Sequence, residues 1–172
     1  MVFGFCEDRI SREVSPIGNS EITKFWPAIT FEHKQYELRE HDIVIAMDGS
    51  LVGKSFAQLS ESDLPALLLQ RVARVRSETI DMGYLKEQIC SVNFTEHCDS
   101  VKTVTAIPHI SPKDIREYVI PVPPTKNEQK LITEILRDMD AEITALEQKR
   151  DKTKLIKQGM MQELLTGKTR LI

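Results

Sequence analysis

The stretch from residue 120 to residue 146 reads IPVPPTKNEQKLITEILRDMDAEITAL, and it decides the architecture of the chain. Three prolines in four positions remove backbone donors and restrict their neighbours, so the segment up to Pro124 cannot be helix interior. Thr125 and Glu128 then have the spacing of a capping box, which predicts that a helix begins here. The apolar residues that follow recur at steps of three and four and form one helical stripe: Leu131, Ile132, Ile135, Leu136, Met139, Ile143 and Leu146.

The expected helix is long, because no proline interrupts the sequence after Thr125 and the stripe resumes at Leu155. Gly167 is typical of a C-terminal stop, so a helix from about Asn127 to Thr166 would be roughly 60 Å long. Spacings of seven residues within the stripe are typical of a coiled-coil seam. We expect a homodimer in which two antiparallel copies bury a helix-pairing interface; a packed helical hairpin and a solvated linker are the alternatives. The expected interface residues are Ile132, Ile135, Leu136, Met139, Ile143 and Leu146.

Residues 1–124 have a different character and predict a small mixed α/β domain, which makes the whole chain α+β with one long C-terminal coiled-coil helix. The predicted domains are therefore 1–124 and 125–172. Short apolar or β-branched runs predict strands, and Ser or Asp before an apolar period predicts helix starts. Strands are expected at 42–47, 67–76, 103–107 and 118–120, and helices between Asp81 and Val92 and from Ser111, where Pro112 is the first helical residue.

Composition limits the possible functions. The chain has 172 residues and a net charge of −3, divided into −5 for residues 1–124 and +2 for the remainder, a balance that argues mildly against DNA binding by the domain. No apolar run approaches the ~18 residues of a membrane span. Acidic residues at positions 7 and 8 come too early for a signal peptide. Cys6, Cys90 and Cys98 are odd in number and form no CxxC pair, so we expect free thiols and a cytoplasmic location.

Motifs for catalysis are weak. Residues 48–55 read DGSLVGKS and resemble a phosphate-binding P-loop, but Asp48 occupies the position of the first glycine, and its carboxylate would repel phosphate. The simpler interpretation is a glycine-hinged hairpin turn that exposes Lys54. Cys90, His97 and Cys98 lack a second pair of zinc ligands. With no glycine-rich cofactor loop and no methyltransferase motif, we expect no metal, no cofactor and no enzymatic activity.

The candidates for DNA contact are basic and small polar residues on the turn and on the strand after it. Alternation along the strand places Arg74 and Arg76 on one face and Arg71 on the other, so at least one of these arginines is expected to be structural. Solvated strand positions balanced by acidic neighbours are the alternative interpretation. The predicted DNA-binding residues are Ser50, Lys54, Arg71, Arg74 and Arg76.

Taken in order, five segments resemble the specificity (S) subunit of type I restriction-modification enzymes over about Phe31 to Ile172. The resemblance implies one target-recognition domain and one conserved helix, which corresponds to half of a full subunit with two domains and two antiparallel helices. The segments are DIVIAMDGSLVGK at 42–54, QRVARVR at 70–76, IPHISPKDI at 107–115, IPVPP followed by EQ at 120–129, and MMQELLTGKTRL at 160–171.

The resemblance also implies a function. A chain of this family is a non-catalytic reader of double-stranded DNA that recognises a half-site and docks the modification (methyltransferase) subunit, with the restriction subunit joining through the complex. The chemistry then belongs to the partner subunits. Two alternatives remain: a truncated specificity chain that acts only as a dimerisation or interaction module, and a small P-loop ATPase.

Overall fold

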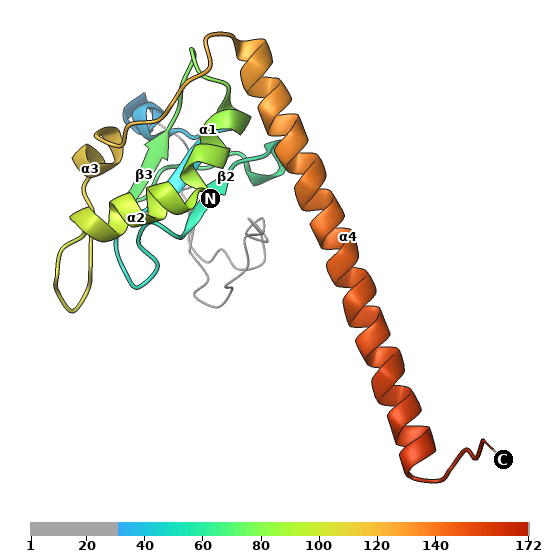
Figure 1. Cartoon of the computed structure of the whole chain (residues 1–172). Coiled ribbons are helices and arrows are strands. Elements are labelled where there is room, and N and C mark those ends of the chain that lie inside the picture. Colours follow the sequence, from blue (N-terminus) through green and yellow to red (C-terminus); the bar gives the residue numbers. More distant parts are fainter. Residues whose placement is uncertain (1–30, 172) are drawn as a thin grey trace. The chain divides into compact units, whose positions relative to one another are not determined.

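The computed structural model describes residues 31–171, which form two compact units, one extending to Lys130 and the other from Leu131 onward (Figure 1). Cys6 and the acidic residues at positions 7 and 8 lie outside the described residues. The architecture is α+β, as predicted: a three-stranded antiparallel sheet with helices forms the first unit, and the second consists mainly of one long helix. We call the first the recognition unit and describe each unit by itself.

The sheet has the strand order β2-β1-β3, with β1 (Ile43–Ala46) in the centre, β2 (Phe56–Gln58) on one side and β3 (Val72–Val75) on the other. The register pairs Val44 with Ala57 of β2 and with Arg74 of β3. All four residues of β1 are buried, which confirms the buried strand predicted at 42–47. A central strand with an unbroken apolar run is expected when both faces of the sheet are covered.

Each face of β1 lies in its own apolar cluster. Ile43 and Ile45 pack with Leu85, Phe94 and other residues of the helices. Val44, which points to the opposite face, packs with residues of the connecting segments, Leu38, Leu59 and Ala66. Because successive side chains of a strand point to opposite faces, a strand of only four residues joins both clusters.

Three helices cover the first face: α1 (Met82–Ile89), α2 (Val92–Val101) and α3 (Pro112–Arg116) (Figure 1). Each begins with a side-chain cap, since Asp81, Ser91 and Ser111 accept hydrogen bonds from backbone N–H groups in their helices. The helices predicted after Asp81 and Ser111 are confirmed. Helix α2 was not predicted, and the short 3-10 helices η2 (Phe31–Tyr36) and η3 (Glu61–Asp63) complete the described elements of this unit.

Two predicted strands are wrong, and a third is shorter than expected. Residues 103–107 belong to a closed loop, because the backbone N–H of Thr103 donates to the carbonyl of His109 (3.0 Å) instead of to a neighbouring strand. Residues 118–120 form no strand either; the Tyr118 ring packs against Phe94 and His97. The strand predicted at 67–76 begins only at Val72, because Arg71 has a positive φ of 70° and interrupts the extended chain.

The first turn of α4 (Lys126–Leu165) is fastened within the recognition unit. Gln129 is only 3% exposed, and its Oε1 accepts from the backbone N–H of Asp81 at 2.8 Å while its Nε2 donates to the carbonyl of Pro123 at 2.9 Å. The backbone N–H of Glu128 donates to the Thr125 hydroxyl at 3.2 Å, as the predicted cap requires. The helix therefore starts from a fixed point beside α1.

The remainder of α4 is a continuous helix, 40 residues in total, so its length of roughly 60 Å agrees with the prediction. It ends two residues before Gly167, whose φ of 72° is typical of a helix C-terminal glycine. Neither α4 nor any other helix among residues 31–171 is both long and apolar enough to cross a bilayer.

Candidate nucleic-acid interface

The structure separates the five predicted DNA-binding residues into two groups at opposite ends of the sheet. In the register of the sheet, Ala46 lies opposite Val72 and Ile43 lies opposite Val75. Arg71 therefore lies at the end where the 47–55 turn leaves β1, and Arg76 lies at the other end. The two arginines are five steps apart along the chain, which places their Cα atoms about 16 Å apart when the chain is extended.

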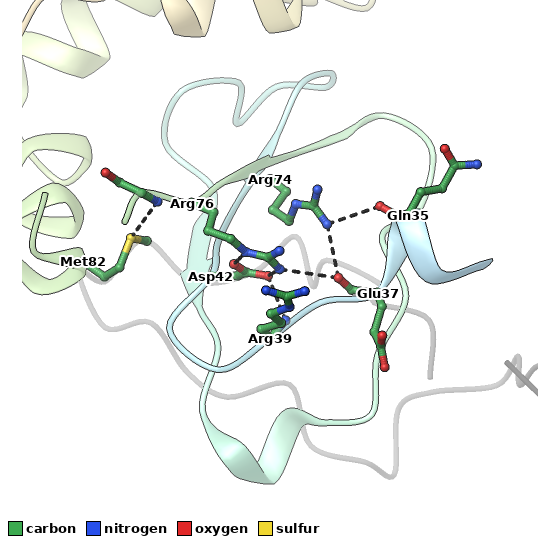
Figure 2. A network of polar contacts seen from close by, with 8 residues as sticks. Gln35, Glu37, Arg39, Asp42, Arg74, Arg76 and Met82 are labelled. Carbon is green, nitrogen blue, oxygen red and sulfur yellow. Dashed lines mark hydrogen bonds and ion pairs between the residues drawn. The ribbon is translucent and has the colours of Figure 1, made fainter. Parts of the chain in front are cut away.

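Arg76 forms an ion pair with the buried carboxylate of Asp42. Its Nε donates to Oδ1 of Asp42 at 2.6 Å and its Nη2 to Oδ2 at 2.5 Å, a bidentate pair that Figure 2 shows in the centre of the polar network. Asp42 is 1% exposed and also accepts from the backbone N–H of Arg39 at 2.8 Å. The hydrogen bonds to Asp42, with its negative charge, raise the pKa of Arg76. This arginine neutralises a buried acid and is structural.

Arg74 is also engaged within the chain. Its Nη1 donates to the backbone carbonyl of Glu37 at 3.1 Å and to that of Gln35 at 3.4 Å, so it fastens the end of η2 to β3 (Figure 2). Arg76 adds a longer bond to the same Glu37 carbonyl, at 3.5 Å. At least one of the arginines was expected to be structural, and both Arg74 and Arg76 are engaged within the chain.

Arg71 is presented differently. Its positive φ is unusual for a residue with a Cβ, and an observed outlier of this kind is a reason to look for a function. The backbone carbonyl of Arg71 accepts from the N–H of Met47 at 3.0 Å, which holds the residue at the end of β1. Its side chain is largely exposed and lies 3.3 Å from the Asp48 carboxylate. An exposed guanidinium whose one partner is half-buried can exchange that partner for a phosphate at small cost.

The 47–55 turn exposes Lys54, as the glycine-hinged interpretation predicted, and it also exposes Ser50. Its two hinges are Gly49 and Gly53, with φ of 93° and 74°. Gly53 lies directly against α2, where a Cβ would come within 2.4 Å of the Cβ of Cys98. The turn is therefore clamped to the helix, and Lys54 is held in place at its edge.

A second loop, residues 103–109, lies beside this turn. The backbone N–H of Gly49 donates to the carbonyl of Pro108 at 3.1 Å, and that of Ile110 donates to the carbonyl of Met47 at 2.9 Å. In Figure 1 this yellow-green loop projects from the recognition unit between α2 and α3, next to the teal 47–55 turn. The β-branched residues of this segment predict a strand; Pro108, which favours a loop, is the signal that could have corrected this prediction.

Further cations surround these loops. Lys102 at the end of α2 lies 2.5 Å from Asp99, and this hydrogen bond, with a smaller contribution from the charge of Lys54, lowers the pKa of Asp99. Lys113 lies 3.5 Å from Glu117. The edge formed by the 47–55 turn, the 103–109 loop and Arg71 is called the loop edge below. It gathers Ser50, Lys54 and Arg71, whereas Arg74 and Arg76 lie elsewhere.

The predicted helix-pairing residues lie on the second unit. Ile132 is half-buried, and the other five, Ile135, Leu136, Met139, Ile143 and Leu146, are exposed. Single exposed apolar residues are ordinary, but a stripe of them along one helix is characteristic of a surface that another helix covers.

The described part of the chain favours neither a metal site nor a reactive thiol at Cys98. No group of three His, Cys, Asp or Glu residues there could hold a metal ion. His97 directs its Nε2 to the carbonyl of Asp114 at 2.8 Å. Cys90 and Cys98 form no disulfide, and burial raises the pKa of the Cys98 thiol to about 11. This thiol is therefore protonated and unreactive at neutral pH.

Comparison with known proteins identifies the family of the chain. Residues 17–155 match the family described as type I restriction modification DNA specificity domain. The chain is similar to the type I restriction enzyme EcoAI specificity subunit of Escherichia coli, with 31% identity over 128 residues, covering 72% of this chain and 20% of that protein. It is also similar to the MjaVIII specificity subunit of Methanocaldococcus jannaschii, with 29% identity over 139 residues, covering 80% of this chain and 31% of that protein. The chain belongs to the family of type I restriction-modification DNA specificity domains.

Proposed function

We propose that the chain is a non-catalytic DNA sequence-recognition component of a type I restriction-modification system, which reads a half-site in double-stranded DNA and docks the modification subunit. The restriction subunit joins through that complex. The family match over residues 17–155 carries the proposal, because it includes both the recognition unit and most of α4. The expected location of such a component is the cytoplasm, with DNA as the substrate of its partners.

DNA contact is assigned to the loop edge. Ser50, Lys54 and Arg71 offer a hydroxyl and two exposed cations, the groups that most often contact phosphate. Using Arg76 instead would require breaking its bidentate pair with Asp42, and using Arg74 would release η2. The recognition unit carries few cations, so part of the phosphate contact is expected to come from the modification subunit.

The test is a titration of duplex DNA with the full chain, alone and with the modification subunit, at several salt concentrations. Lys54→Ala and Arg71→Gly should each weaken binding and lower the salt slope by about one unit per lost phosphate contact. Glycine suits the positive φ at position 71, so that variant removes the cation without straining the backbone. Lys34→Ala, an exposed lysine of η2 outside both the loop edge and α4, is the control and should bind like the wild type. If both loop-edge variants also bind like the wild type, the recognition surface lies elsewhere.

Dimerisation is proposed through α4. The seam residues from Ile132 to Leu146 span about 21 Å of helix, and burying one such aliphatic side chain stabilises by roughly 1.5–3 kcal/mol. A second, antiparallel copy would cover the seam and present two identical recognition units, so the favoured target is an interrupted palindrome. Residues 1–124 remain the proposed DNA-binding domain and residues 125–172 the helix for dimerisation and docking.

Ile143→Asp should give monomers in sedimentation velocity, because a carboxylate would have to be buried in the seam. Gln148→Asp places the same charge on an exposed polar position of α4 and should leave the dimer intact. A wild-type chain that sediments as a monomer at micromolar concentration would contradict the pairing.

One observation favours a second candidate function. The net charge of −5 over residues 1–124 suits a chain that dimerises or docks the modification subunit without reading DNA. Retained association with that subunit, together with no DNA binding by the wild type in either titration, would favour this function. The P-loop alternative is tested by calorimetry with ATP and by an assay of ATP hydrolysis. Because Asp48 occupies the position of the first glycine, we expect no binding and no Lys54-dependent hydrolysis.

A further inference from the structure

The 103–109 loop exposes two large apolar side chains. Val104 is fully exposed, and Ile107 is 64% exposed. The segment from Lys102 to Lys113 contains two lysines, one histidine and no acidic residue, although residues 1–124 together carry a net charge of −5. The two lysines pair with Asp99 and Glu117, which lie just outside the segment. An apolar tip without acidic residues of its own is suited to an anionic partner that also offers apolar groups.

The loop is closed by its own polar groups. The Thr103 hydroxyl accepts from the backbone N–H of His109 at 3.0 Å and lies 2.9 Å from Nδ1 of the same residue. The Thr105 hydroxyl donates to the carbonyl of Ile107 at 2.7 Å. Because these hydroxyls are engaged within the loop, Val104 and Ile107 are the groups that it offers to a partner. These bonds close the loop before a partner binds, which lowers the ordering entropy that binding would cost.

We propose that Val104 and Ile107 are specificity-determining residues that contact the C5-methyl group of thymine in the major groove. The inference rests on the proposed function and deepens it. Phosphate contacts from Lys54 and Arg71 carry no sequence information, whereas the thymine methyl is the apolar feature that distinguishes base pairs in this groove. The groove is about 12 Å wide and admits a two-stranded ribbon, so a closed loop of two chain segments can enter it.

A protein partner fits the loop less well. Binding hot spots between proteins are enriched in Trp, Tyr and Arg, and the segment 102–113 contains none of these. Lys54 on the adjacent turn is exposed, and Lys102, which pairs with Asp99, directly precedes the loop; both are cations of the kind that contact phosphate beside a groove.

The test uses the full chain with the modification subunit to select duplexes from a randomised library. The wild type should select thymine at one or more positions. Replacing those thymines by deoxyuridine removes only the methyl groups and should weaken wild-type binding about fourfold for each contacted methyl. The double variant Val104→Ser/Ile107→Ser should bind the thymine and deoxyuridine duplexes equally. Val92→Ser removes an exposed apolar side chain at the far end of α2, about 14 Å along the helix from the loop, and should behave like the wild type.

The outcomes separate the two levels of the proposal. If the wild type binds no DNA, the proposed function fails and this inference fails with it. If the wild type selects a sequence but the serine variant keeps the wild-type preference for thymine over deoxyuridine, DNA reading stands and the role of Val104 and Ile107 is refuted. If the serine variant loses the modification subunit while keeping its base preference, the loop is a protein contact and the inference is also overturned.

Discussion

Alanine at Gly53 tests whether the clamp between the 47–55 turn and α2 holds the loop edge. Both hinge glycines have left-handed backbone, so a Cβ at either costs about 1–2 kcal/mol, partly offset by the lower entropy of the unfolded chain. Only at Gly53 does the new Cβ also meet packed atoms, at 2.4 Å from the Cβ and 2.9 Å from the Sγ of Cys98. At Gly49 nothing lies within 4 Å. Gly49→Ala is therefore the matched control.

The magnitudes follow from these distances. Gly49→Ala should destabilise the recognition unit by about 1 kcal/mol. Gly53→Ala adds overpacking, typically about 1–3 kcal/mol, for a total of about 2–4 kcal/mol. Because Lys54 follows directly, DNA affinity should fall more in Gly53→Ala than in the control. The variant Cys98→Gly removes the Cβ that the new side chain at position 53 would contact. In that background, Gly53→Ala should therefore destabilise the recognition unit by only about as much as Gly49→Ala does in the wild type.

Native-state hydrogen exchange at the amides of β1 is a suitable assay, since these buried amides report the opening of the recognition unit without a contribution from α4. Equal destabilisation by the two alanine variants would refute the reasoning, because the steric contact with α2 would then contribute nothing. Wild-type protection in Gly53→Ala would refute it as well.

Three further predictions concern buried groups of the recognition unit. Arg76→Met should destabilise by about 3 kcal/mol in urea unfolding, because it leaves the Asp42 carboxylate buried without its cation, and a loss below about 1 kcal/mol would contradict the structural role. Burial, and to a smaller extent the charges of Asp99 and Asp114, raise the pKa of Cys98 from 9.0 to about 11. Between these values the folded chain keeps a proton that the unfolded chain loses. The free energy of unfolding should therefore fall between about pH 9 and pH 11, by up to about 3 kcal/mol. Cys98→Ala should abolish this part of the pH dependence, and an unchanged slope would refute the assignment. Gln129→Ala should lower the free energy of unfolding by about 1–3 kcal/mol and increase hydrogen exchange at the N-terminus of α1, because two buried hydrogen bonds are lost. Unchanged exchange there would show that Gln129 does not fasten the first turn of α4.

Features governed by local chemistry could be predicted from the sequence. The start of α4 at Thr125, its stop before Gly167 and the starts of α1 and α3 depend on residues within one helical turn of each other. The buried strand β1 also depended on a local signal, an apolar run before a turn. Helix α2 was missed because its sequence is mostly polar and only Phe94 and Cys98 are buried.

Tertiary structure decided which of the candidate cations are available to DNA. Arg76 and Asp42 are 34 residues apart in sequence, and no local pattern indicates that they form a buried pair. The carbonyl of Arg71, a residue with positive φ, accepts a hydrogen bond from Met47, and the 103–109 loop is held beside the 47–55 turn by bonds across more than fifty residues. Hydrophobic periodicity and helix capping depend on residues close together in the sequence, so they can be recognised from the sequence alone. The pairing of charges and loops depends on which distant segments the packed core brings together, so only the folded chain separates the structural arginines from the exposed loop edge.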